Sequence, residues 1–306
     1  MPAATWFRLP LAAALLALCG LIVSVHAKDA DDDDDDAVAA SPASAGSAGR
    51  GAAVQREVIY TPAGWPTALS GDLFTPGGTV PANGWPAVVA LHGGAWHKGD
   101  RQKLAGFAKR LASRGYVALT IDYRLVPDAI YPAQLQDVQQ AVRWVRANAA
   151  TIGVDPKRIA LWGSSAGAHL AVLEAGLSPG DRLYDAQARV QAVVGAGTPT
   201  DFRDGGGGNK SLASFLGERW SAGSKVFIEA SPIAHVSADD PPVFLIHGDA
   251  DKTVPPEQAI VYRDALTAAG VPNTLLLLPG VGHSLGPAGR DALMRGVEFL
   301  DQRLRP

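Results

Sequence analysis

The sequence predicts an α/β fold with a mostly parallel central sheet and helices on both of its faces. From about residue 54 onward, short continuous apolar runs alternate with segments of helical spacing. Strands that are apolar along their whole length are typical of parallel sheets buried on both faces. One segment, 198–240, departs from this alternation and contains the run Gly205–Gly208. We expect it to form a small cap insertion over the edge of the sheet.

The expected strands are apolar runs bounded by turn residues. They are VQREVIY (54–60), LSGDLFTP (69–76), WPAVVALHGG (85–94), YVALTIDYRL (116–125), RIALWGSS (158–165), VQAVVGAG (190–197), PVFLIHGD (242–249) and TLLLLPG (274–280). Helices are expected between them, at 103–114, 135–153, 166–177, 258–269 and 290–305. In 135–153 the apolar residues recur at the three- and four-residue spacing of a buried helix face.

The N-terminus has the pattern of an export signal. Arg8 precedes the apolar run Leu9–Val25, and Val25 and Ala27 are small residues at the two positions that a signal peptidase reads. Residues 1–27 are therefore expected to be a cleaved signal peptide, and the mature chain to be periplasmic or secreted without a stable membrane anchor. The alternative is an uncleaved anchor, because about 17 apolar residues lie at the lower limit for spanning a bilayer.

Residues 28–53 are expected to form a disordered linker. Six consecutive aspartates, Asp31–Asp36, are followed by Ala, Ser and Gly, a composition that buries too little apolar surface to fold. The acidic run lacks the spaced ligands and turn glycine of a calcium loop. The catalytic domain is then expected to span 54–306.

Composition excludes several classes of function. The single cysteine, Cys19, permits neither an internal disulfide nor a Cys/His zinc cluster. The chain has 27 Lys+Arg and 30 Asp+Glu, of which residues 1–53 hold 3 and 7, so the expected domain keeps 24 and 23. A nearly neutral domain gives no indication of the basic face that nucleic-acid binding requires. We therefore expect a small-molecule partner and no nucleic acid.

The stretch GSSAG (163–167) predicts a nucleophilic serine. A glycine stands two residues before and two residues after Ser165, between the buried run 159–162 and a helix. A strand that passes through Gly-x-Ser-x-Gly into a helix forms a nucleophile elbow. Side chains at the two glycine positions would collide with the neighbouring strand and helix. Ser164 lacks this glycine spacing and is expected to be structural.

A serine hydroxyl needs a base, which is normally a histidine oriented by a carboxylate. Four histidines follow Ser165: His169 inside the next helix, His235 in the insertion, His247 at the end of a strand, and His283 after the last strand. Only His283 begins a loop at the expected edge of the sheet, so it is the expected base. Asp249 and Asp251 are the candidate acids, and we expect Asp249 to bond backbone in its turn.

The loop HGGAW (92–96) follows an apolar strand and can supply donors for an oxyanion. Backbone N–H groups of Gly94, Ala95 and Ala166 are the expected donors, with Gly93 shaping the turn. Trp96 is a candidate wall of the substrate pocket, and packing in the core is the alternative.

These motifs resemble α/β-hydrolases of the esterase/lipase branch related to hormone-sensitive lipase and to bacterial feruloyl-esterase-like carboxylesterases. The matching pieces, in order, are HGGAW (92–96), DYRL (122–125), YPAQLQDVQQAVRWVRANA (131–149), GSSAG (163–167), SPI (231–233), HGDADKTVP (247–255) and GVGH (280–283). The resemblance implies the α/β-hydrolase fold and a triad of Ser165, His283 and Asp251, with Asp251 favoured over Asp249. It implies an acyl-enzyme mechanism that needs no metal or organic cofactor.

The resemblance implies serine esterase chemistry, and together with the expected signal peptide and the small insertion it predicts an exported carboxylesterase acting on short-chain, acetyl or feruloyl esters. Ala95 stands where hormone-sensitive lipases usually have a third glycine, which leaves the substrate class open. One alternative is an amide hydrolase similar to kynurenine formamidase. Another is a non-catalytic binding protein on a hydrolase scaffold. The insertion contains no long helical lid, which favours small water-soluble substrates.

Overall fold

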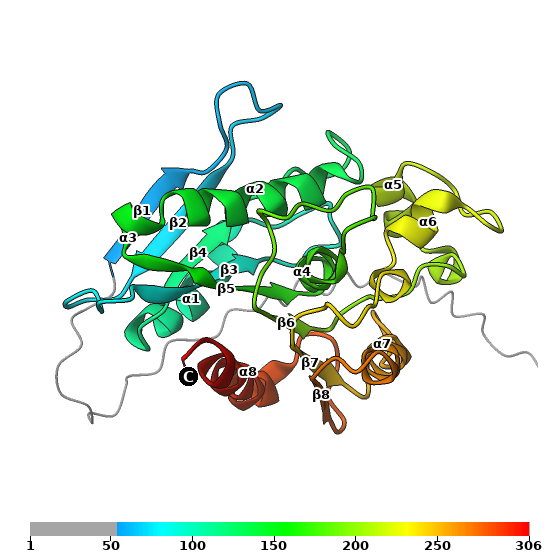
Figure 1. Cartoon of the computed structure of the whole chain (residues 1–306). Coiled ribbons are helices and arrows are strands. Elements are labelled where there is room, and N and C mark those ends of the chain that lie inside the picture. Colours follow the sequence, from blue (N-terminus) through cyan, green and yellow to red (C-terminus); the bar gives the residue numbers. More distant parts are fainter. Residues whose placement is uncertain (1–53, 306) are drawn as a thin grey trace, which may run out of the picture. The chain divides into compact units, whose positions relative to one another are not determined.

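An eight-stranded sheet with the order β1-β2-β4-β3-β5-β6-β7-β8 forms the centre of the fold (Figure 1). The computed structural model describes residues 54–305, so the signal peptide and linker expected in 1–53 lie outside the described residues. β2 runs antiparallel to β1 and to β4, and the remaining neighbours are parallel. The strands are β1 Val54–Ile59, β2 Ser70–Thr75, β3 Trp85–Leu91, β4 Val117–Ile121, β5 Val154–Ser164, β6 Ala192–Ala196, β7 Val243–Gly248 and β8 Asn273–Leu278.

Helices connect the parallel strands, as the alternating pattern predicts. They are α1 Ala105–Ser113, α2 Ala133–Ala147, α3 Ala149–Ile152, α4 Ala166–Gly176, α5 Lys210–Leu216, α6 Lys225–Glu229, α7 Glu257–Ala268 and α8 Gly289–Leu304. Short 3₁₀ turns precede α1 at Arg101–Leu104 and α8 at Gly286–Ala288, and two more lie in the insertion at Gly206–Gly208 and Pro232–Ala234. The helix expected over 135–153 is divided at Asn148 into α2 and α3.

Two hydrophobic cores lie on the two faces of the sheet. Alternate residues of β3 face opposite sides: Val89 and Leu91 belong to one core, and Val88 and Ala90 belong to the other. The first core includes buried side chains of α2, α4 and α7, and the second includes those of α1 and α8. Figure 1 shows α2 and α4 on one side of the sheet and α1 and α8 on the other. The α/β-hydrolase architecture expected from the sequence is therefore confirmed.

β4 is shorter than the apolar run predicts. It ends at Ile121. The Asp122 N–H still donates to the Ser70 carbonyl of β2 at 3.0 Å, but the side chains of residues 122–124 bind polar groups outside the sheet. Asp122 accepts from the backbone N–H of Arg101 at 2.8 Å and from its guanidinium. The Tyr123 ring stacks on His92, and its hydroxyl donates to the His92 carbonyl at 2.8 Å. These contacts hold the loop after β3 in place.

The insertion 198–240 lies beyond the carboxyl end of β6 and contains α5 and α6. Figure 1 shows these helices beyond α4, at the opposite end from β1. α5 buries Leu212, Phe215 and Leu216 in the core that contains α2 and α4. Within residues 54–305, no helix has the length and hydropathy needed to cross a membrane.

Glu174 is a carboxyl group buried in the middle of the fold. It lies in α4 with 1% of its surface exposed, and its Oε2 accepts one hydrogen bond from Gln139 Nε2 at 2.8 Å. Burial raises the pKa of Glu174 to about 8, while the Gln139 bond acts in the opposite direction. The folded protein therefore holds this group neutral at pH values where the unfolded chain ionises it, which favours unfolding as pH rises.

We expect Glu174→Gln to stabilise the protein at pH 8 and to change little at pH 4. The amide keeps the bond from Gln139 but cannot ionise. The variant therefore avoids the free energy that folding of the wild type costs when Glu174 must stay protonated, between the ordinary pKa of glutamate and about 8. Thermal unfolding followed by circular dichroism at the two pH values measures this. The midpoint should rise by roughly 2–4 °C for each kcal/mol recovered. An equal effect at both pH values would show that ionisation of Glu174 is not the cause.

Candidate active site

Ser165 lies on a strained turn between β5 and α4. Its backbone has φ 51° and ψ −117°, a combination that is unfavourable for a residue with a side chain. The turn is fixed on both sides, because the Ser165 N–H donates to the Ala196 carbonyl of β6 at 2.8 Å and its carbonyl accepts from the His169 N–H at 2.9 Å. The neighbouring Ser164 ends β5 and pairs with Ala196 in the sheet.

The two glycines of the motif permit this turn. A Cβ at Gly163 would lie 2.3 Å from the backbone of Gly167, and a Cβ at Gly167 would lie 2.3 Å from the Leu91 carbonyl oxygen of β3. Neither backbone neighbour can move without disturbing the sheet. The collision expected from the sequence is therefore the reason for glycine at both positions.

Three chain segments bring Ser165, His283 and Asp251 together. His283 follows β8, and its Nε2 lies 2.9 Å from Ser165 Oγ. Its Nδ1 lies 2.7 Å from Oδ2 of Asp251, which follows β7. All three residues stand at the carboxyl ends of parallel strands, where the loops of such a sheet converge. The sequence predicted this set, and the structure joins it by two hydrogen bonds.

The environment of Asp251 determines the tautomer of His283. Asp251 is 5% exposed, and its Oδ1 accepts from the N–H groups of Thr253 and Val254, each at 2.9 Å. Burial acts to raise the pKa of this carboxyl, but hydrogen bonds from His247, His283 and Val254 outweigh burial and hold the pKa below its usual range. An ionised carboxylate only accepts, so Nδ1 of His283 donates and Nε2 is free to accept from the serine.

Two neighbours of this set were not predicted from the sequence. His247, interpreted as a packing residue at the end of β7, is fully buried, and its Nε2 lies 2.9 Å from the Val254 carbonyl and 3.3 Å from Asp251 Oδ2. Because both partners accept, Nε2 carries a proton and supports the charge on Asp251. Gly197, with φ 60°, lies beside His283, where a Cβ would be 3.0 Å from the ring. Only the tertiary contact between these segments shows either role.

The other candidates from the sequence lie outside this set. The Asp249 carboxylate bonds backbone as expected, but in the turn after β8 and not in its own turn: it accepts from the Gly280 N–H at 2.6 Å. His169 is buried in α4, and its Nε2 lies 2.8 Å from the Ala230 carbonyl. His235 lies 2.8 Å from Asp181 through Nδ1 and 2.8 Å from the Glu229 carbonyl through Nε2.

The loop after β3 also contacts the turn at Ser165. A Cβ on Gly93 would lie 3.2 Å from the Ser165 Cβ, so this backbone touches the elbow. Gly94, Ala95 and Trp96 follow with φ of 124°, 51° and 65°, a succession of left-handed residues. The His97 and Lys98 N–H groups close the turn by donating to the Gly94 carbonyl at 3.0 and 3.1 Å. The candidate donors Gly94 and Ala95 therefore stand in a fixed turn next to Ser165, and Ala166 begins α4 directly after it.

Trp96 packs beneath the insertion. It is 4% exposed and stacks on Phe215 of α5 with ring centroids 4.3 Å apart. His169 and Phe202 meet its ring edge-on at 5.3 and 6.0 Å. This is the packing alternative for Trp96, and a role as a wall of the substrate pocket stays a prediction.

No cluster of metal ligands accompanies these residues. Within residues 54–305, no group of three or more His, Cys, Asp or Glu side chains is arranged to hold a metal ion. The chemistry available at the elbow is that of a nucleophile, a base, a carboxylate and backbone donors.

The fold and this constellation define an α/β-hydrolase with a nucleophile elbow. The BD-FAE family model matches residues 72–266, a stretch that runs from β2 into α7. The chain belongs to the BD-FAE family.

Several curated relatives with similar sequences are named as esterases. Esterase LipC of Mycobacterium tuberculosis is 37% identical over 220 residues, which cover 67% of this chain and 54% of LipC. Esterase LipQ of the same organism is 32% identical over 248 residues, covering 77% of this chain and 58% of LipQ. The chain therefore spans about half the length of these curated relatives.

Two solved structures match more completely. A truncated carbohydrate esterase from gut microbiota has a TM-score of 0.71 at 25% identity, over 84% of this chain and 97% of that chain. A thermophilic esterase of Thermogutta terrifontis, also solved with propionate and with butyrate bound, has a TM-score of 0.70 at 27% identity, over 82% of this chain and 94% of that chain.

We expect Asp251→Asn to lower kcat by about 10⁴, because an amide at this position can donate to Nδ1 and leave His283 in the wrong tautomer. Asp249→Asn is the matched control, since its oxygen can still accept from Gly280. Steady-state hydrolysis of p-nitrophenyl acetate measures both. Equal losses in the two variants would show that Asp251 has no special part in the reaction.

Proposed function

We propose that the protein is an exported serine carboxylesterase that hydrolyses short-chain carboxylic esters or acetyl and feruloyl esters of saccharides. The observation that carries the proposal is the continuous hydrogen-bonded set of Ser165, His283 and Asp251 at a nucleophile elbow. Esterase relatives and membership of the BD-FAE family support the reaction class. Export rests on the N-terminal sequence pattern alone.

The proposed reaction follows from the positions of the atoms. Ser165 Oγ attacks the ester carbonyl while its proton passes to His283 Nε2, 2.9 Å away. Asp251 stabilises the imidazolium that forms, through the bond to Nδ1. The N–H groups of Gly94, Ala95 and Ala166 bind the oxyanion.

His283 then protonates the leaving alcohol, and the acyl group remains on Ser165. Water, activated by the same imidazole, attacks the acyl-enzyme and releases the acid. Each proton is returned within one cycle, so the residues named here complete the reaction.

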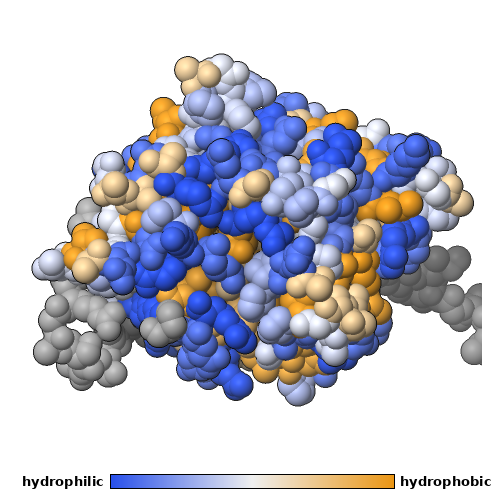
Figure 2. All heavy atoms as spheres, in the orientation of Figure 1, coloured by the Kyte–Doolittle hydropathy of each residue, from blue (hydrophilic) through white to orange (hydrophobic). Residues whose placement is uncertain are grey.

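Three observations support small or saccharide-linked esters. The α-helices of the insertion, α5 and α6, have seven and five residues, so within residues 54–305 the insertion supplies no long helical lid. The face in Figure 2 intersperses hydrophobic with hydrophilic residues and lacks the broad apolar area that docks on oil. The Thermogutta terrifontis esterase has been solved with propionate and butyrate, and another similar structure is a carbohydrate esterase.

We expect Ser165→Ala to reduce hydrolysis of p-nitrophenyl acetate by about 10⁶, to background, because no neighbouring group replaces the nucleophile. Ser164→Ala is the control and should keep most of the activity. Paraoxon should add a phosphoryl group to the wild type and to Ser164→Ala but not to Ser165→Ala, as read by peptide mass spectrometry. A phosphorylated Ser164, or activity that survives in Ser165→Ala, would refute this assignment.

We expect kcat/KM to be highest for acyl chains of about two to four carbons, because the insertion provides little apolar surface for a longer chain. A series of p-nitrophenyl acetate, butyrate and octanoate in solution, with tributyrin below and above its solubility limit, measures the preference. An N-formyl amide in the same series addresses the amide-hydrolase alternative. A jump in rate at the emulsion interface would contradict the proposal and identify the insertion as a lipase lid.

A further inference from the structure

A cavity of about 790 Å³ lies in the insertion. Its lining comes from the glycine-rich turn 205–209, from α5, from residues 217–220 and from Phe227. Ser165, His283 and Asp251 are not among the lining residues. α5 separates the cavity from the core, because Lys210, Ala213, Ser214 and Gly217 line it, whereas Leu212, Phe215 and Leu216 are buried on the other side.

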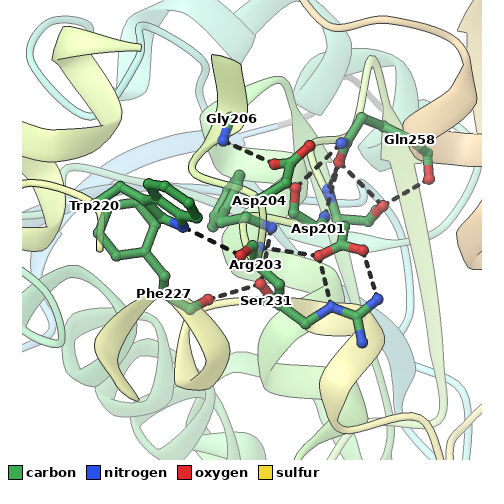
Figure 3. Close-up of polar contacts among 10 residues, drawn as sticks. Asp201, Arg203, Asp204, Gly206, Trp220, Phe227, Ser231 and Gln258 are labelled. Atoms are coloured by element: carbon green, nitrogen blue, oxygen red, sulfur yellow. Dashed lines mark hydrogen bonds and ion pairs between the residues drawn. The ribbon is translucent and has the colours of Figure 1, made fainter. Parts of the chain in front are cut away.

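Trp220 forms an anchored aromatic surface in this cavity. A single exposed apolar side chain is ordinary, and Trp220 is 45% exposed. Its ring is also fixed by a hydrogen bond, since Nε1–H donates to the Arg203 carbonyl at 3.1 Å. Figure 3 shows Trp220 beside Arg203 and Gly206, with Phe227 below it.

The segment beneath Trp220 is itself fastened to α7. Arg203 forms a two-point ion pair with Asp201, through Nε at 2.8 Å and Nη2 at 2.6 Å. The Asp201 N–H donates to Gln258 Oε1 at 2.8 Å, and Gln258 Nε2 donates back to the Asp201 carbonyl at 3.1 Å. Figure 3 shows this chain of contacts from Gln258 to Trp220. The ring is therefore held in place before any ligand binds, which lowers the entropy lost on binding.

Gly205 makes room for the indole. It has φ 84°, and a Cβ at this position would lie 2.5 Å from Trp220 Cγ. The preceding residue, Asp204, accepts from the Gly206 N–H at 2.9 Å and completes the turn. One edge of the Trp220 ring therefore packs against the Gly205 backbone, and the rest of the ring surface is open to the cavity.

Two of the three charged side chains that line the cavity are cations. Lys210 and Arg219 line the cavity, and among residues 54–305 neither forms an ion pair. The carboxylate of the cavity, Glu218, already accepts from Ser224 Oγ at 2.7 Å. Asn209 adds a polar side chain at the start of α5.

An acidic sugar ring matches both the aromatic surface of Trp220 and the two cations, Lys210 and Arg219. The C–H groups on one face of a pyranose carry partial positive charge and pack against the negative face of an aromatic ring. A carboxylate on the same sugar can pair with a guanidinium in two-point fashion and with an ammonium. A neutral sugar would leave the two cations without a partner. A purely aliphatic chain would displace water from Lys210, Arg219 and Asn209 without replacing its hydrogen bonds.

We propose that this cavity binds an acidic sugar residue in the alcohol part of the ester substrate, with Trp220 as the stacking surface and Arg219 and Lys210 as partners of the carboxylate. The inference rests on the proposed esterase function. The cavity lies across α5 from the Trp96 cluster, about 10 Å away, the diameter of a helix with its side chains. A sugar bound here is therefore distant from the scissile ester and belongs to a longer saccharide.

Calorimetric titration of the full chain with trigalacturonate, and with xylotriose as the neutral probe, tests the proposal. We expect the acidic trimer to bind at least about tenfold more tightly, and added salt to weaken its binding. Trp220→Ala should weaken binding about tenfold and Arg219→Gln about fivefold, the losses expected from a stacking ring and one charge-assisted pair. Ile228→Ala and Lys225→Gln are matched controls in the same insertion, outside the lining, and should bind like the wild type.

Kinetics separate this proposal from the proposed esterase function. On p-nitrophenyl acetate, Trp220→Ala and Arg219→Gln should behave like the wild type, whereas on an acetylated trigalacturonate KM should rise about tenfold with kcat unchanged. Unaltered trigalacturonate binding in both variants, or equally tight binding of xylotriose, would overturn the proposed sugar site and leave the esterase function standing. Binding as expected in a chain that hydrolyses no ester would overturn the esterase function and leave the sugar site standing.

Discussion

The backbone strain at Ser165 is the constraint on which the rest of the site depends. A non-glycine residue at φ 51° and ψ −117° is held there only because β5 and α4 are fixed around it. Gly163 and Gly167 allow α4 to approach β5 and β3 so closely that the turn has no room to relax. The same close packing sets the Ala166 N–H at the start of α4 and brings the loop after β3 against the serine. A change that loosened this contact would therefore move the nucleophile and its candidate oxyanion donors together.

Asp251 shows how a buried charge is retained beside this turn. An isolated carboxylate with 5% exposure would protonate, since burial without partners favours the neutral form. Here two backbone N–H groups fix Oδ1, and two histidines approach Oδ2. Three of these donors, the Thr253 and Val254 N–H groups and His247, come from β7 and the turn after it. They orient the carboxylate independently of His283. His283 then needs only its bond to Oδ2 to hold the tautomer in which Nε2 accepts the serine proton.

The sequence predicts the strands and helices well because their signals are local, and continuous apolar runs identify the parallel strands. Glycine spacing and chain order predict Ser165 and His283, whereas the choice of Asp251 over Asp249 comes from the family resemblance; the structure brings these three side chains within hydrogen-bonding distance. The end of β4 was less predictable, because Asp122 and Tyr123 leave the sheet to meet Arg101 and His92. His247 and Gly197 could not be assigned from their own neighbours in sequence, since their importance comes from contacts with segments that follow other strands. Burial of Trp96 likewise depends on Phe215, which the insertion supplies.

The insertion is better understood as a support for the loop after β3 than as an appended lid. Phe215 covers Trp96, and Trp96 continues the left-handed turn that contains Gly94 and Ala95, so one face of α5 helps to fix the candidate oxyanion donors. The other face of α5 lines a cavity with Trp220 and two cations. Because the two faces share one short helix, residues on the outer face can vary with little effect on Trp96, provided that Leu212, Phe215 and Leu216 keep α5 in place. Under the proposed function, this separation lets the outer surface change which alcohol is bound while the surroundings of Ser165 stay the same.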